Sequence, residues 1–531
     1  MDFMKRHGLM GLYDLLAETS QSYPNKLAVI CGENRLTYGQ LRNRVDKMAA
    51  SFLSLGIRKE KKVAVLHKNC HIFLESYFAV AKIGAVLVPI NYRLTPKEFI
   101  FILKNSQAEA LIVQPEFLTS EFESSNQIPL LKNIILTKSS AVSETSIKSE
   151  NYESLIKNAD KEMAPEISIP DSSIAQIYYT SGMTGKPKGV ILTHRNNRKH
   201  AIGAIQELKL SSADNWLHVS PMFHLADAWA VWALTKTAAT HVFIPSFESQ
   251  AVLLAIQEHK VTLSNFIPTM LNMLVNSPRV EDYDCSSLRV ILSGGAPIAK
   301  EVVKKVLTTF GCDYIQTYGL TETSPFITMS ILEEDMKDFS FEEQLRYKAT
   351  TGRPFSGVQL KIVGEDGCEV KRDEKEVGEI IVKGETVTPG YWRQPEETSK
   401  RIIDGWLHTR DLAVVNPKGY ITIVDRMDDV IITGGENVYS VEVEDTLYSH
   451  PGILEAAVVG LPDPVWGEMV TAVVVPKKGV PADEGDILEF CQTRLAQFKS
   501  PKKVIFTDSL PKTGSAKICK YKLREKFSKI M

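Results

Sequence analysis

The sequence lacks a long apolar run of the kind that crosses a membrane. Its most apolar helical stretch, 77–90, is interrupted by Lys82, whereas a membrane-spanning helix needs about 18–20 uninterrupted apolar residues. The chain begins Met1-Asp2-Phe3-Met4, with an early acid and no apolar segment like that of a signal peptide. We therefore expect no membrane span and a cytoplasmic protein.

Paired cysteines and an excess of one charge are also missing. Seven cysteines are scattered from Cys31 to Cys519 with no CxxC pair, which is typical of free thiols in a reducing compartment. The 62 Lys and Arg face 64 Asp and Glu, for a net charge of -2. That balance argues against a nucleic-acid partner, because such proteins usually carry a basic excess.

The chain is too long for one hydrophobic core. It has 531 residues, and a single core stops growing near about 250–300 residues. Strand-like and helix-like segments alternate up to residue 357, which predicts an α/β fold with parallel sheets covered by helices. The polar stretch 139–150 is predicted to be a surface loop. In this part, predicted strands are 62–66, 85–90, 110–113, 133–136, 241–245, 261–266 and 289–293, and 72–82 is a predicted helix.

In the last third of the chain the pattern of predicted helices and strands changes. Short strand-like runs separated by Gly and charged turns, at 358–363 and 379–383, indicate an antiparallel β subdomain. From Asp429 onward the segments predict a compact α+β unit of about 100 residues. Its predicted helices are 441–449 and 485–495, and its predicted strands are 454–459 and 471–475. We therefore predict a large domain over 1–427 and a small one over 428–531.

The segment from Tyr178 to Gly189, YYTSGMTGKPKG, is the most informative one. Its three glycines let the backbone approach a ligand closely, and its three hydroxyls and two lysines can surround the oxygens of a polyphosphate. It is not a Walker A loop, because the spacing from Gly182 to Lys186 is wrong and Pro187 stands where Ser or Thr would bind Mg²⁺. Strand-like runs flank it, so we predict a phosphate loop between two strands, with a plain polar hairpin as the alternative.

Four further segments are less specific when each is taken alone. Glu322 beside two hydroxyls suits a hard cation such as Mg²⁺, although a capped helix start explains the same pattern. Asp411 can accept hydrogen bonds from both ribose hydroxyls, although a turn or an ion pair is equally compatible. Lys517 by itself is typical of a surface lysine. The segments are QTYGLTET (316–323), DGWLHTRD (404–411), DRMDDVIITGGENV (425–438) and PKTGSAKI (511–518).

In their order and spacing, the five segments resemble the adenylate-forming superfamily of acyl-CoA synthetases, peptide-synthetase adenylation domains and luciferases. The resemblance covers essentially the whole chain and includes SPMFH (220–224) and SGGAP (293–297). It implies a large N-terminal domain of two α/β subdomains plus a β subdomain, then a small mobile α+β domain. It also implies an AMP-forming carboxylic acid–CoA ligase that uses ATP, Mg²⁺ and coenzyme A.

The resemblance implies a role for each matching residue. Glu322 would bind Mg²⁺, and Asp428 would be the hinge between the domains. The ATP phosphates would be held by Thr180, Ser181, Gly182, Thr184, Gly185, Lys186 and Lys188. The rest of the nucleotide would contact Gly295, Ala296, Pro297, Gln316, Thr317, Tyr318, Gly319, Thr321, Asp411 and Arg426, the last two at the ribose. Coenzyme A would contact Gly434, Gly435, Trp466 and Lys499.

The acyl pocket is predicted to be mostly apolar and aromatic. Its predicted residues are Phe223, His224, Trp229, Phe266, Gly294 and Thr323. Because this set offers no Lys or Arg for a second carboxylate, the expected substrate is an apolar monocarboxylate, with an alicyclic or aromatic ring or a short-to-medium chain. Trp229 is predicted to limit the chain length.

The expected reaction has two steps, and its predicted catalytic residues are Lys517, Thr184, Glu322 and His224. The carboxylate first joins AMP with loss of pyrophosphate, and Lys517 would neutralise the repulsion between the carboxylate and the α-phosphate. The thiolate of coenzyme A then attacks the acyl carbonyl. For this step the small domain would rotate about Asp428 and replace Lys517 with residues 434–436.

Three residues depart from the family pattern. Arg410 and Ala516 stand where the family commonly has Gly, and Ser440 replaces a usual Pro. If the Gly positions require a positive φ, Arg and Ala would each cost about 1 kcal/mol. None of the three removes a catalytic side chain, so the expected activity is unchanged.

Two alternatives stay open. A stand-alone adenylation enzyme would load its acid onto a carrier protein, and amino-acid activators of this kind usually carry a pocket Asp, for which Asp227 is a candidate. A noncatalytic nucleotide-binding protein is the other alternative. The sequence identifies neither the acid nor the oligomeric state, and a homodimer is compatible with it.

Overall fold

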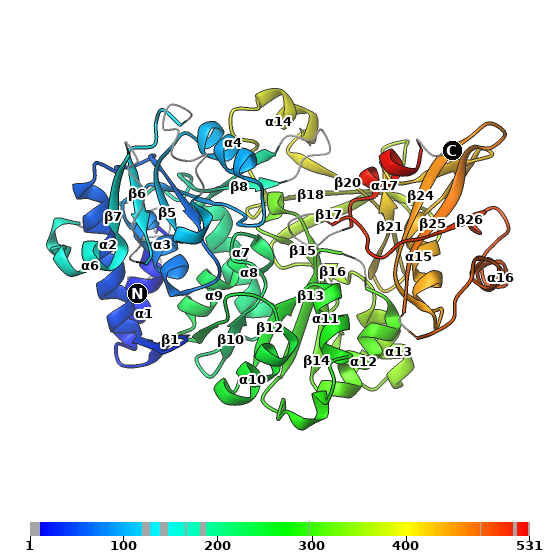
Figure 1. Cartoon of the computed structure of the whole chain (residues 1–531), viewed down its shortest axis with the longest axis horizontal. Coiled ribbons are helices and arrows are strands. Elements are labelled where there is room, and N and C mark those ends of the chain that lie inside the picture. Colours follow the sequence, from blue (N-terminus) through cyan, green and yellow to red (C-terminus); the bar gives the residue numbers. More distant parts are fainter. Residues whose placement is uncertain are drawn as a thin grey trace.

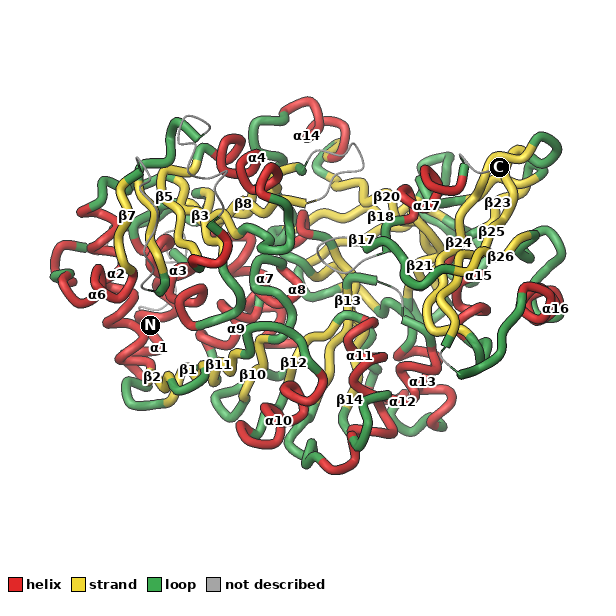
Figure 2. Tube along the Cα trace, viewed as in Figure 1, coloured by secondary structure: helices red, strands yellow, loops and turns green. Residues whose placement is uncertain are grey.

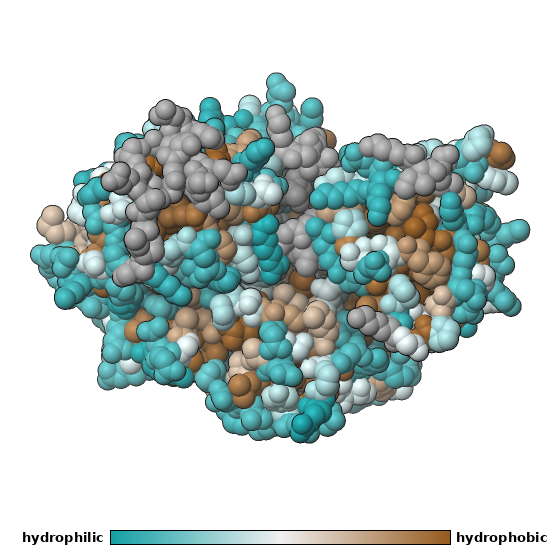
Figure 3. Space-filling model, in the orientation of Figure 1, coloured by the Kyte–Doolittle hydropathy of each residue, from teal (hydrophilic) through white to brown (hydrophobic). Residues whose placement is uncertain are grey.

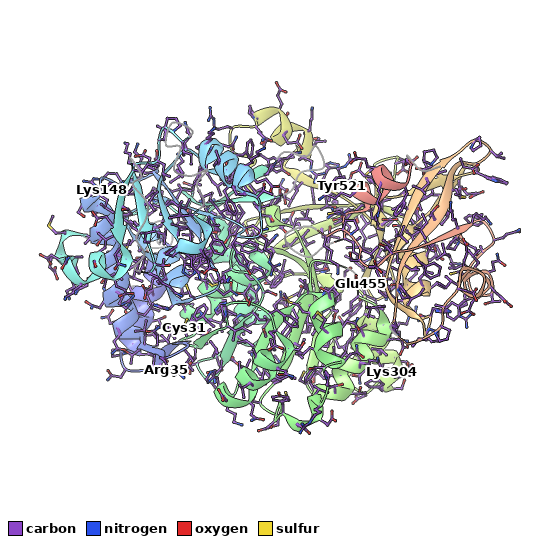
Figure 4. All side chains as sticks on the ribbon, in the orientation of Figure 1. Cys31, Arg35, Lys148, Lys304, Glu455 and Tyr521 are labelled. Carbon is purple, nitrogen blue, oxygen red and sulfur yellow. The ribbon has the colours of Figure 1, made fainter. Side chains whose placement is uncertain are left out.

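The computed structural model describes residues 11–118, 128–138, 147–164, 167–180, 187–296, 298–477, 479–512 and 518–528. Figure 1 shows a large body that contains the N-terminus and, to its right, a smaller body that contains the C-terminal segments. Cys31 and Arg35 belong to the large body, whereas Glu455 and Tyr521 belong to the smaller one (Figure 4). No helix among the described residues is long and apolar enough to cross a membrane.

The largest sheet of the described residues has a parallel centre and antiparallel edges. Strands β1, β10, β11, β12, β13 and β14 pair in parallel, and β2, β15 and β16 are antiparallel to their neighbours. Across the sheet the strands are β16 (Arg353–Pro354), β15 (Phe326–Met329), β14 (Asp313–Gly319), β13 (Val290–Gly294), β12 (Leu263–Phe266), β10 (Asn215–His218), β11 (Thr240–Phe243), β1 (Leu27–Cys31) and β2 (Asn34–Thr37).

A second sheet in the large body is parallel except at one edge, where β8 and β9 form an antiparallel pair. Its central strands are short apolar runs because helices cover both faces of the sheet there. In β3, Val63 and Val65 face one core while Ala64 and Leu66 face another. Across the sheet the strands are β7 (Lys148–Asn151), β6 (Asn133–Leu136), β5 (Ala108–Val113), β3 (Lys62–Leu66), β4 (Val86–Pro89), β8 (Ile174–Thr180) and β9 (Lys188–Thr193).

Helices fill the space between the two sheets and cover their outer faces (Figure 2). One core joins side chains of both sheets to the inner helices α1 (Tyr13–Ser22), α2 (Tyr38–Ser54), α3 (His71–Lys82), α7 (His194–Glu207) and α9 (Ala230–Lys236). On the outside, α4 (Pro96–Ser106) covers the second sheet, and α10 (Ser249–His259), α11 (Pro268–Val275), α12 (Lys300–Phe310) and α13 (Phe341–Lys348) cover the first. Shorter elements are α6 (Tyr152–Asn158), α8 (Leu225–Ala228), η1 (Pro115–Phe117), η3 (Lys161–Met163), η4 (Val280–Asp282), η5 (Thr321–Thr323) and η6 (Glu334–Met336).

An antiparallel sheet completes the large body. The short strand-like runs separated by Gly and charged turns predict this arrangement. Its side chains join the core between the two larger sheets. The strands are β17 (Val358–Val363), β18 (Gly378–Gly384), β19 (Ile402–Ile403), β20 (Trp406–Val415) and β21 (Ile421–Arg426), with α14 (Pro395–Arg401) preceding β19.

The small body is a mixed sheet with helices on both faces. Helices α15 (Ser440–Tyr448) and α16 (Glu484–Gln492) cover one face, and α17 (Lys520–Phe527) covers the other. Its strands are β22 (Ile431–Thr433), β23 (Glu436–Val438), β24 (Ile453–Asp463), β25 (Gly467–Pro476) and β26 (Lys503–Phe506). The predicted fold class, a large α/β domain with a β subdomain and a small α+β domain, is confirmed. The boundary between residues 427 and 428 stays a prediction.

The polar stretch 139–150 departs from its predicted loop structure at its end. Lys148–Asn151 form β7, which pairs in parallel with β6 at the edge of the second sheet. Residues 139–146 lie outside the described residues. The prediction was wrong for 148–150 because an edge strand needs only backbone hydrogen bonds, and its side chains can be polar where they face water.

Candidate active site

The glycine-rich segment lies in the hairpin of β8 and β9, where Thr180 pairs with Lys188 across the two strands. The strand–loop–strand arrangement that the sequence predicts is therefore present. Five of the predicted phosphate-binding residues lie outside the described residues: Ser181, Gly182, Thr184, Gly185 and Lys186. Pro297 and Lys517 also lie outside them.

The turn after β14 carries Thr321 and Glu322. Gly319 allows a close approach there, since a Cβ atom on it would lie 1.8 Å from the carbonyl oxygen of Pro325. The Thr323 hydroxyl donates to the Leu320 carbonyl at 3.0 Å and accepts from the Leu320 N–H at 3.1 Å. Thr323 is buried and holds the turn together, so its hydroxyl is used within the backbone rather than in a pocket wall. The turn packs against β9, the strand that follows the glycine-rich loop.

Asp411, Arg426 and Tyr318 meet at the end of the antiparallel sheet. Asp411 and Arg426 are cross-strand partners on β20 and β21, and Arg426 Nε lies 3.1 Å from Asp411 Oδ1. The Tyr318 hydroxyl donates to Asp411 Oδ2 at 2.6 Å. Burial, reinforced by the Asp411 charge, raises the pKa of Tyr318 well above its usual value, so the phenol stays a donor. The structure thus brings together the residues predicted to hold the base and the ribose.

Glu322 is 8% exposed and has a buried phenol beside it. The Tyr391 hydroxyl donates to Glu322 Oε1 at 2.8 Å, and Tyr391 is 5% exposed. Within the described part of the chain, no other group hydrogen-bonds to this carboxylate. Burial, and then the Glu322 charge, raise the pKa of Tyr391 above its usual value.

The acidic groups suit a metal ion that arrives with its phosphates. The described residues contain no cluster of three or more His, Cys, Asp or Glu that could hold a metal by itself. Mg²⁺ is commonly held by one or two carboxylates plus the phosphates of a nucleotide. A single buried carboxylate at Glu322, beside the hydroxyl of Thr321, fits that chemistry and is the predicted metal ligand.

Lys188 has an acidic partner that the sequence did not predict. Its ammonium lies 2.5 Å from Glu397 Oε1, on α14, and 5.9 Å from the centre of the Tyr391 ring. The ion pair therefore holds Lys188 near the Tyr391 ring. The pair lowers the pKa of Glu397, mainly through the hydrogen bond from Lys188.

The other predicted nucleotide residues lie at the ends of β13 and β14. Gly294 permits close pairing of these strands, because a Cβ atom on it would lie 2.3 Å from Thr317 Oγ1. The Thr317 hydroxyl donates to the Ser293 carbonyl at 2.9 Å. Gln316 Nε2 donates to the Ala296 carbonyl at 3.2 Å, and Gly295 has a φ of +87°. Gln316 and Thr317 thus fix the backbone at 293–296.

Trp229 is 1% exposed and belongs to a buried aromatic cluster. Its ring contacts Trp216 and Phe326 with centroids 5.1 and 5.0 Å apart, and His200 at 5.7 Å. His200 also stacks on Phe355 at 5.1 Å. Burial lowers the pKa of His200 to about 3, so this ring is neutral and packs as part of the aromatic cluster.

Phe223 and His224 lie at the start of α8, on the same side as Trp229, and their ring centroids are 5.8 Å apart. Phe266 does not join them. It is fully buried in the core formed with α10–α12, whereas Trp229, Phe223 and Tyr318 belong to the core between the sheets. The assignment of Phe266 to the acyl pocket stays a prediction. Its side chain points away from the other residues of that set because side chains alternate along β12, and the preceding residue, Asn265, donates to the Ala226 carbonyl on α8.

Asp227 is enclosed by protein groups. Its Oδ2 lies 2.5 Å from His218 Nδ1, and its Oδ1 accepts from Trp216 Nε1 at 3.1 Å. His218 in turn contacts His241, with 2.9 Å between Nε2 and Nδ1. Both carboxylate oxygens are therefore already used, and Asp227 has no exposed surface with which to meet a substrate ammonium.

The predicted hinge residue, Asp428, is held by Arg410, with 2.5 Å between Arg410 Nη2 and Asp428 Oδ1. Arg410 has a φ of +63°, the conformation that favours Gly. Ser440, which stands where the family has Pro, donates its N–H to Asp425 Oδ2 at 2.5 Å and its hydroxyl to the same oxygen at 2.7 Å. Proline could make neither bond. Ala516 lies outside the described residues.

The predicted coenzyme A residues all belong to the C-terminal part of the chain, in the small body. Gly434, with φ +60°, donates its N–H to the Trp466 carbonyl at 2.8 Å, and a Cβ atom on it would lie 2.9 Å from the Trp466 ring. Gly435 is exposed, and Trp466 is 58% exposed. Lys499 forms an ion pair with Glu442 at 2.8 Å.

Sequence reasoning missed Tyr391, Glu397, His200 and Phe326. Tyr391 follows Gly390 in the run TPGYW, and a Tyr among Gly and Pro was the available signal. Phe326 lies four residues after Glu322, so its proximity to the turn was also visible. Their contacts with Glu322, Lys188 and Trp229 join segments far apart in the sequence, which no local pattern reveals.

Comparisons with known proteins show the family of the chain. The family described as AMP-binding enzyme matches residues 16–392, and the AMP-binding enzyme C-terminal domain matches residues 442–517. A feruloyl-CoA synthase from Amycolatopsis sp is 37% identical over 505 residues, covering 95% of this chain and 96% of that protein. A fatty acid–[acyl-carrier-protein] ligase, ScoC, from Streptomyces coeruleorubidus is 32% identical and covers 99% of this chain and 98% of its own length.

A solved structure extends the likeness to three dimensions. The anthranilate CoA ligase AuaEII, in complex with anthranoyl-AMP, superposes with a TM-score of 0.89 at 26% identity, covering 98% of both chains. By its family pattern, its full-length relatives and its fold, the chain belongs to the AMP-binding enzyme family, among the AMP-forming acid–thiol ligases that make acyl-CoA.

Proposed function

We propose that the protein joins an apolar monocarboxylate, most favourably an aromatic one, to coenzyme A through an acyl-adenylate. One observation carries the proposal: a single stretch, Tyr318–Phe326, has nucleotide-type residues at one end and an aromatic wall at the other. Tyr318 bonds Asp411, Glu322 is buried beside Tyr391, and Phe326 contacts Trp229. An acid bound against Phe326 would have its carboxylate directed to the nucleotide.

The aromatic cluster supports an apolar acid. Trp229, Phe326 and neutral His200 offer flat apolar surfaces, which suit a ring by stacking or edge contacts. The feruloyl and anthranilate ligases that resemble this chain take aromatic acids by name. Gly294 and Thr323 would contribute to the carboxylate end of the pocket only indirectly, by fixing the backbone of that region.

The polar groups would act on ATP in different ways. Asp411 would accept from the ribose hydroxyls, while Tyr318 and Arg426 hold its carboxylate in place. Thr180, Lys188 and the residues of the loop between them would hold the phosphates. A Mg²⁺ ion at Glu322 would offset the charge of the departing pyrophosphate.

Lys517 would neutralise the α-phosphate and the carboxylate as they meet, because the two anions repel each other. The small domain would then turn about Asp428 so that the face bearing Gly434, Gly435 and Trp466 replaces Lys517. The ion pair between Arg410 and Asp428 would have to break or swing during this motion. We keep the domain limits at 1–427 and 428–531 as part of this proposal.

A carrier-protein ligase is the second candidate, favoured by the similarity to ScoC. The amino-acid version of that alternative is disfavoured by Asp227, whose two oxygens are engaged by His218 and Trp216. The seven free cysteines suit a reducing cytoplasm. Light scattering of the purified chain tests the homodimer that the sequence leaves open.

One experiment tests the proposed function: AMP release from ATP over a panel of aliphatic, alicyclic and aromatic acids, with either coenzyme A or a phosphopantetheinylated carrier protein. We expect coenzyme A-dependent AMP release, highest with aromatic acids. Turnover only with the carrier protein would favour the second candidate. No AMP with any acid would favour a noncatalytic nucleotide-binding protein.

A further inference from the structure

We propose that Tyr391 is a positioning residue for the metal–ATP complex: its hydroxyl fixes one oxygen of the Glu322 carboxylate and thereby orients the other for the metal ion. The inference deepens the proposed function and rests on it. It starts from the 2.8 Å hydrogen bond between two buried side chains that lie 69 positions apart in the sequence.

A phenol suits this task because it is a neutral donor. A Lys or Arg in the same place would cancel the negative charge of Glu322 and compete with a cation for it. The Tyr391 hydroxyl restrains the carboxylate and leaves its charge in place. Groups that orient a metal ligand in this way commonly change metal affinity by about 10- to 100-fold when they are removed.

Tyr391 is itself fixed to the strand that follows the glycine-rich loop. It forms a bridge with Val190 on β9, and on either side of it Ile191 donates to the Gly390 carbonyl at 3.1 Å and Trp392 donates to the Gly189 carbonyl at 2.7 Å. The Tyr391 N–H also donates to Thr398 Oγ1 at 3.0 Å. The phenol therefore has a set position relative to the phosphate hairpin.

The same segment fixes the backbone of Glu322. The Thr388 N–H donates to the Glu322 carbonyl at 2.7 Å, and the Thr388 hydroxyl donates to the Ile191 carbonyl at 2.5 Å. Residues 388–391 thus connect the hairpin that would hold the phosphates to the turn that carries the metal ligand. Loss of the phenol alone would leave these backbone bonds in place and free only the carboxylate.

The test is ATP binding to full-length Tyr391→Phe, measured by calorimetry without any acid, once with Mg²⁺ and once with EDTA. We expect the gain in ATP affinity that Mg²⁺ provides to fall by about 10-fold, while affinity in EDTA stays the same. We also expect the Mg²⁺ concentration for half-maximal acyl-AMP formation to rise, with kcat restored at high Mg²⁺.

Tyr152→Phe is a matched control. Tyr152 is also buried and donates to a carboxylate, Glu75 Oε2, at 2.9 Å, but in the packing of α6 on α3. It should lower thermal stability by a similar amount and leave the Mg²⁺-dependent gain unchanged. In a Glu322→Gln background, Tyr391→Phe should have no further effect on that gain, since it acts through the carboxylate.

Three outcomes would overturn the inference: an unchanged Mg²⁺-dependent gain in Tyr391→Phe, an equal loss of affinity with Mg²⁺ and with EDTA, or an undiminished effect in the Glu322→Gln background. Each requires that the wild type binds ATP more tightly with Mg²⁺. A wild type that binds no ATP contradicts the proposed function itself, and the inference with it.

Discussion

At the scale of single residues, two departures from the family pattern are explained by contacts that the new side chains make. Arg410 adopts the positive φ expected of a Gly position and binds Asp428. Ser440 supplies an N–H and a hydroxyl to Asp425, which is buried. Both contacts lie beside the predicted hinge, so we expect these departures to affect a rotation between the domains rather than the chemistry of the site.

We predict that Arg410→Gly speeds thioester formation from supplied acyl-adenylate by about threefold, since an exposed ion pair contributes about 0.2–1 kcal/mol. Adenylate formation should change less. Single-turnover kinetics of the two half-reactions measure this. Arg410→Ala also loses the pair but keeps the positive φ, so it should show the same kinetics with lower stability. Unchanged rates of both half-reactions in both variants would mean that the ion pair does not affect the domain rotation.

Trp229→Ala should let the enzyme accept longer or bulkier acids, because it opens space beside Phe326 and His200. It should also cost about 3–5 kcal/mol of stability. Trp232→Ala is the control, since Trp232 is equally buried but contacts Tyr77 and Phe78. The measurement is the activity profile over acids of increasing length. The same shift in the acid profile of both variants would mean that the loss of core packing, and not the loss of a pocket wall, causes it.

Lys517→Ala should lower acyl-adenylate formation by at least about 100-fold, the scale of losing one preorganised charge donor. Thioester formation from supplied adenylate should be affected much less. Pyrophosphate release and thioester formation are measured separately. Equal losses in the two steps would contradict the two-conformation mechanism.

At the scale of elements, short apolar runs identified strands well. Runs such as 62–66 and 133–136 coincide with β3 and β6 because strands buried on both faces are continuously apolar. β7 was missed because a polar edge strand has no such run. The strand of Phe266 was recognised without the direction of its side chains, so the sequence did not show that Phe266 packs in a different core from Trp229. Register and facing depend on neighbouring strands, which local sequence does not specify.

The turn between β14 and β15 should be intolerant of even one added methyl group. Gly319→Ala would place a Cβ atom 1.8 Å from the Pro325 carbonyl oxygen, so the turn that carries Glu322 must shift. We expect a stability loss of about 1–3 kcal/mol and weaker ATP binding, measured by thermal unfolding and calorimetry. Gly11→Ala, where the nearest atom would be 3.5 Å away, is the control. Normal ATP binding by Gly319→Ala would show that the turn does not fix the nucleotide site.

At the scale of the whole molecule, the motifs indicate candidate segments for the site but not the long-range contacts that connect them. The view in Figure 3 shows a surface that is mostly hydrophilic, with hydrophobic residues in patches between, so composition gives little help in locating the site. The bonds of Tyr391 to Glu322 and of Lys188 to Glu397 join positions 69 and 209 apart. Such contacts depend on how the three sheets pack together, so the sequence of any one segment does not predict them.

Stability should fall in mild acid because three histidines are buried in neutral form. Burial lowers the pKa of His67 and His194 to about 4 and that of His200 to about 3. A histidine in the unfolded chain has a pKa of about 6.5. At a pH below that value the unfolded chain binds protons that the folded protein does not, so stability decreases as the pH falls towards the folded pKa values. Each histidine should cost about 2 kcal/mol between pH 7 and 5.

Thermal unfolding of the wild type and His67→Gln at the two pH values measures this effect. His67 bonds to Thr137 and lies outside the candidate site, so the variant should keep its activity. We expect His67→Gln to lose less stability on acidification than the wild type. An identical acid loss in the two proteins would mean that His67 is not neutral when folded.

The pairing of Asp411 with Arg426 has a consequence for how the nucleotide leaves. These residues form the last cross-strand pair of β20 and β21, two positions before Asp428. If the small domain turns about Asp428, the motion would therefore act directly on the pair predicted to hold the ribose. AMP escape and domain rotation should then be one event, so a fluorescent label on the nucleotide sugar would report the rotation in real time.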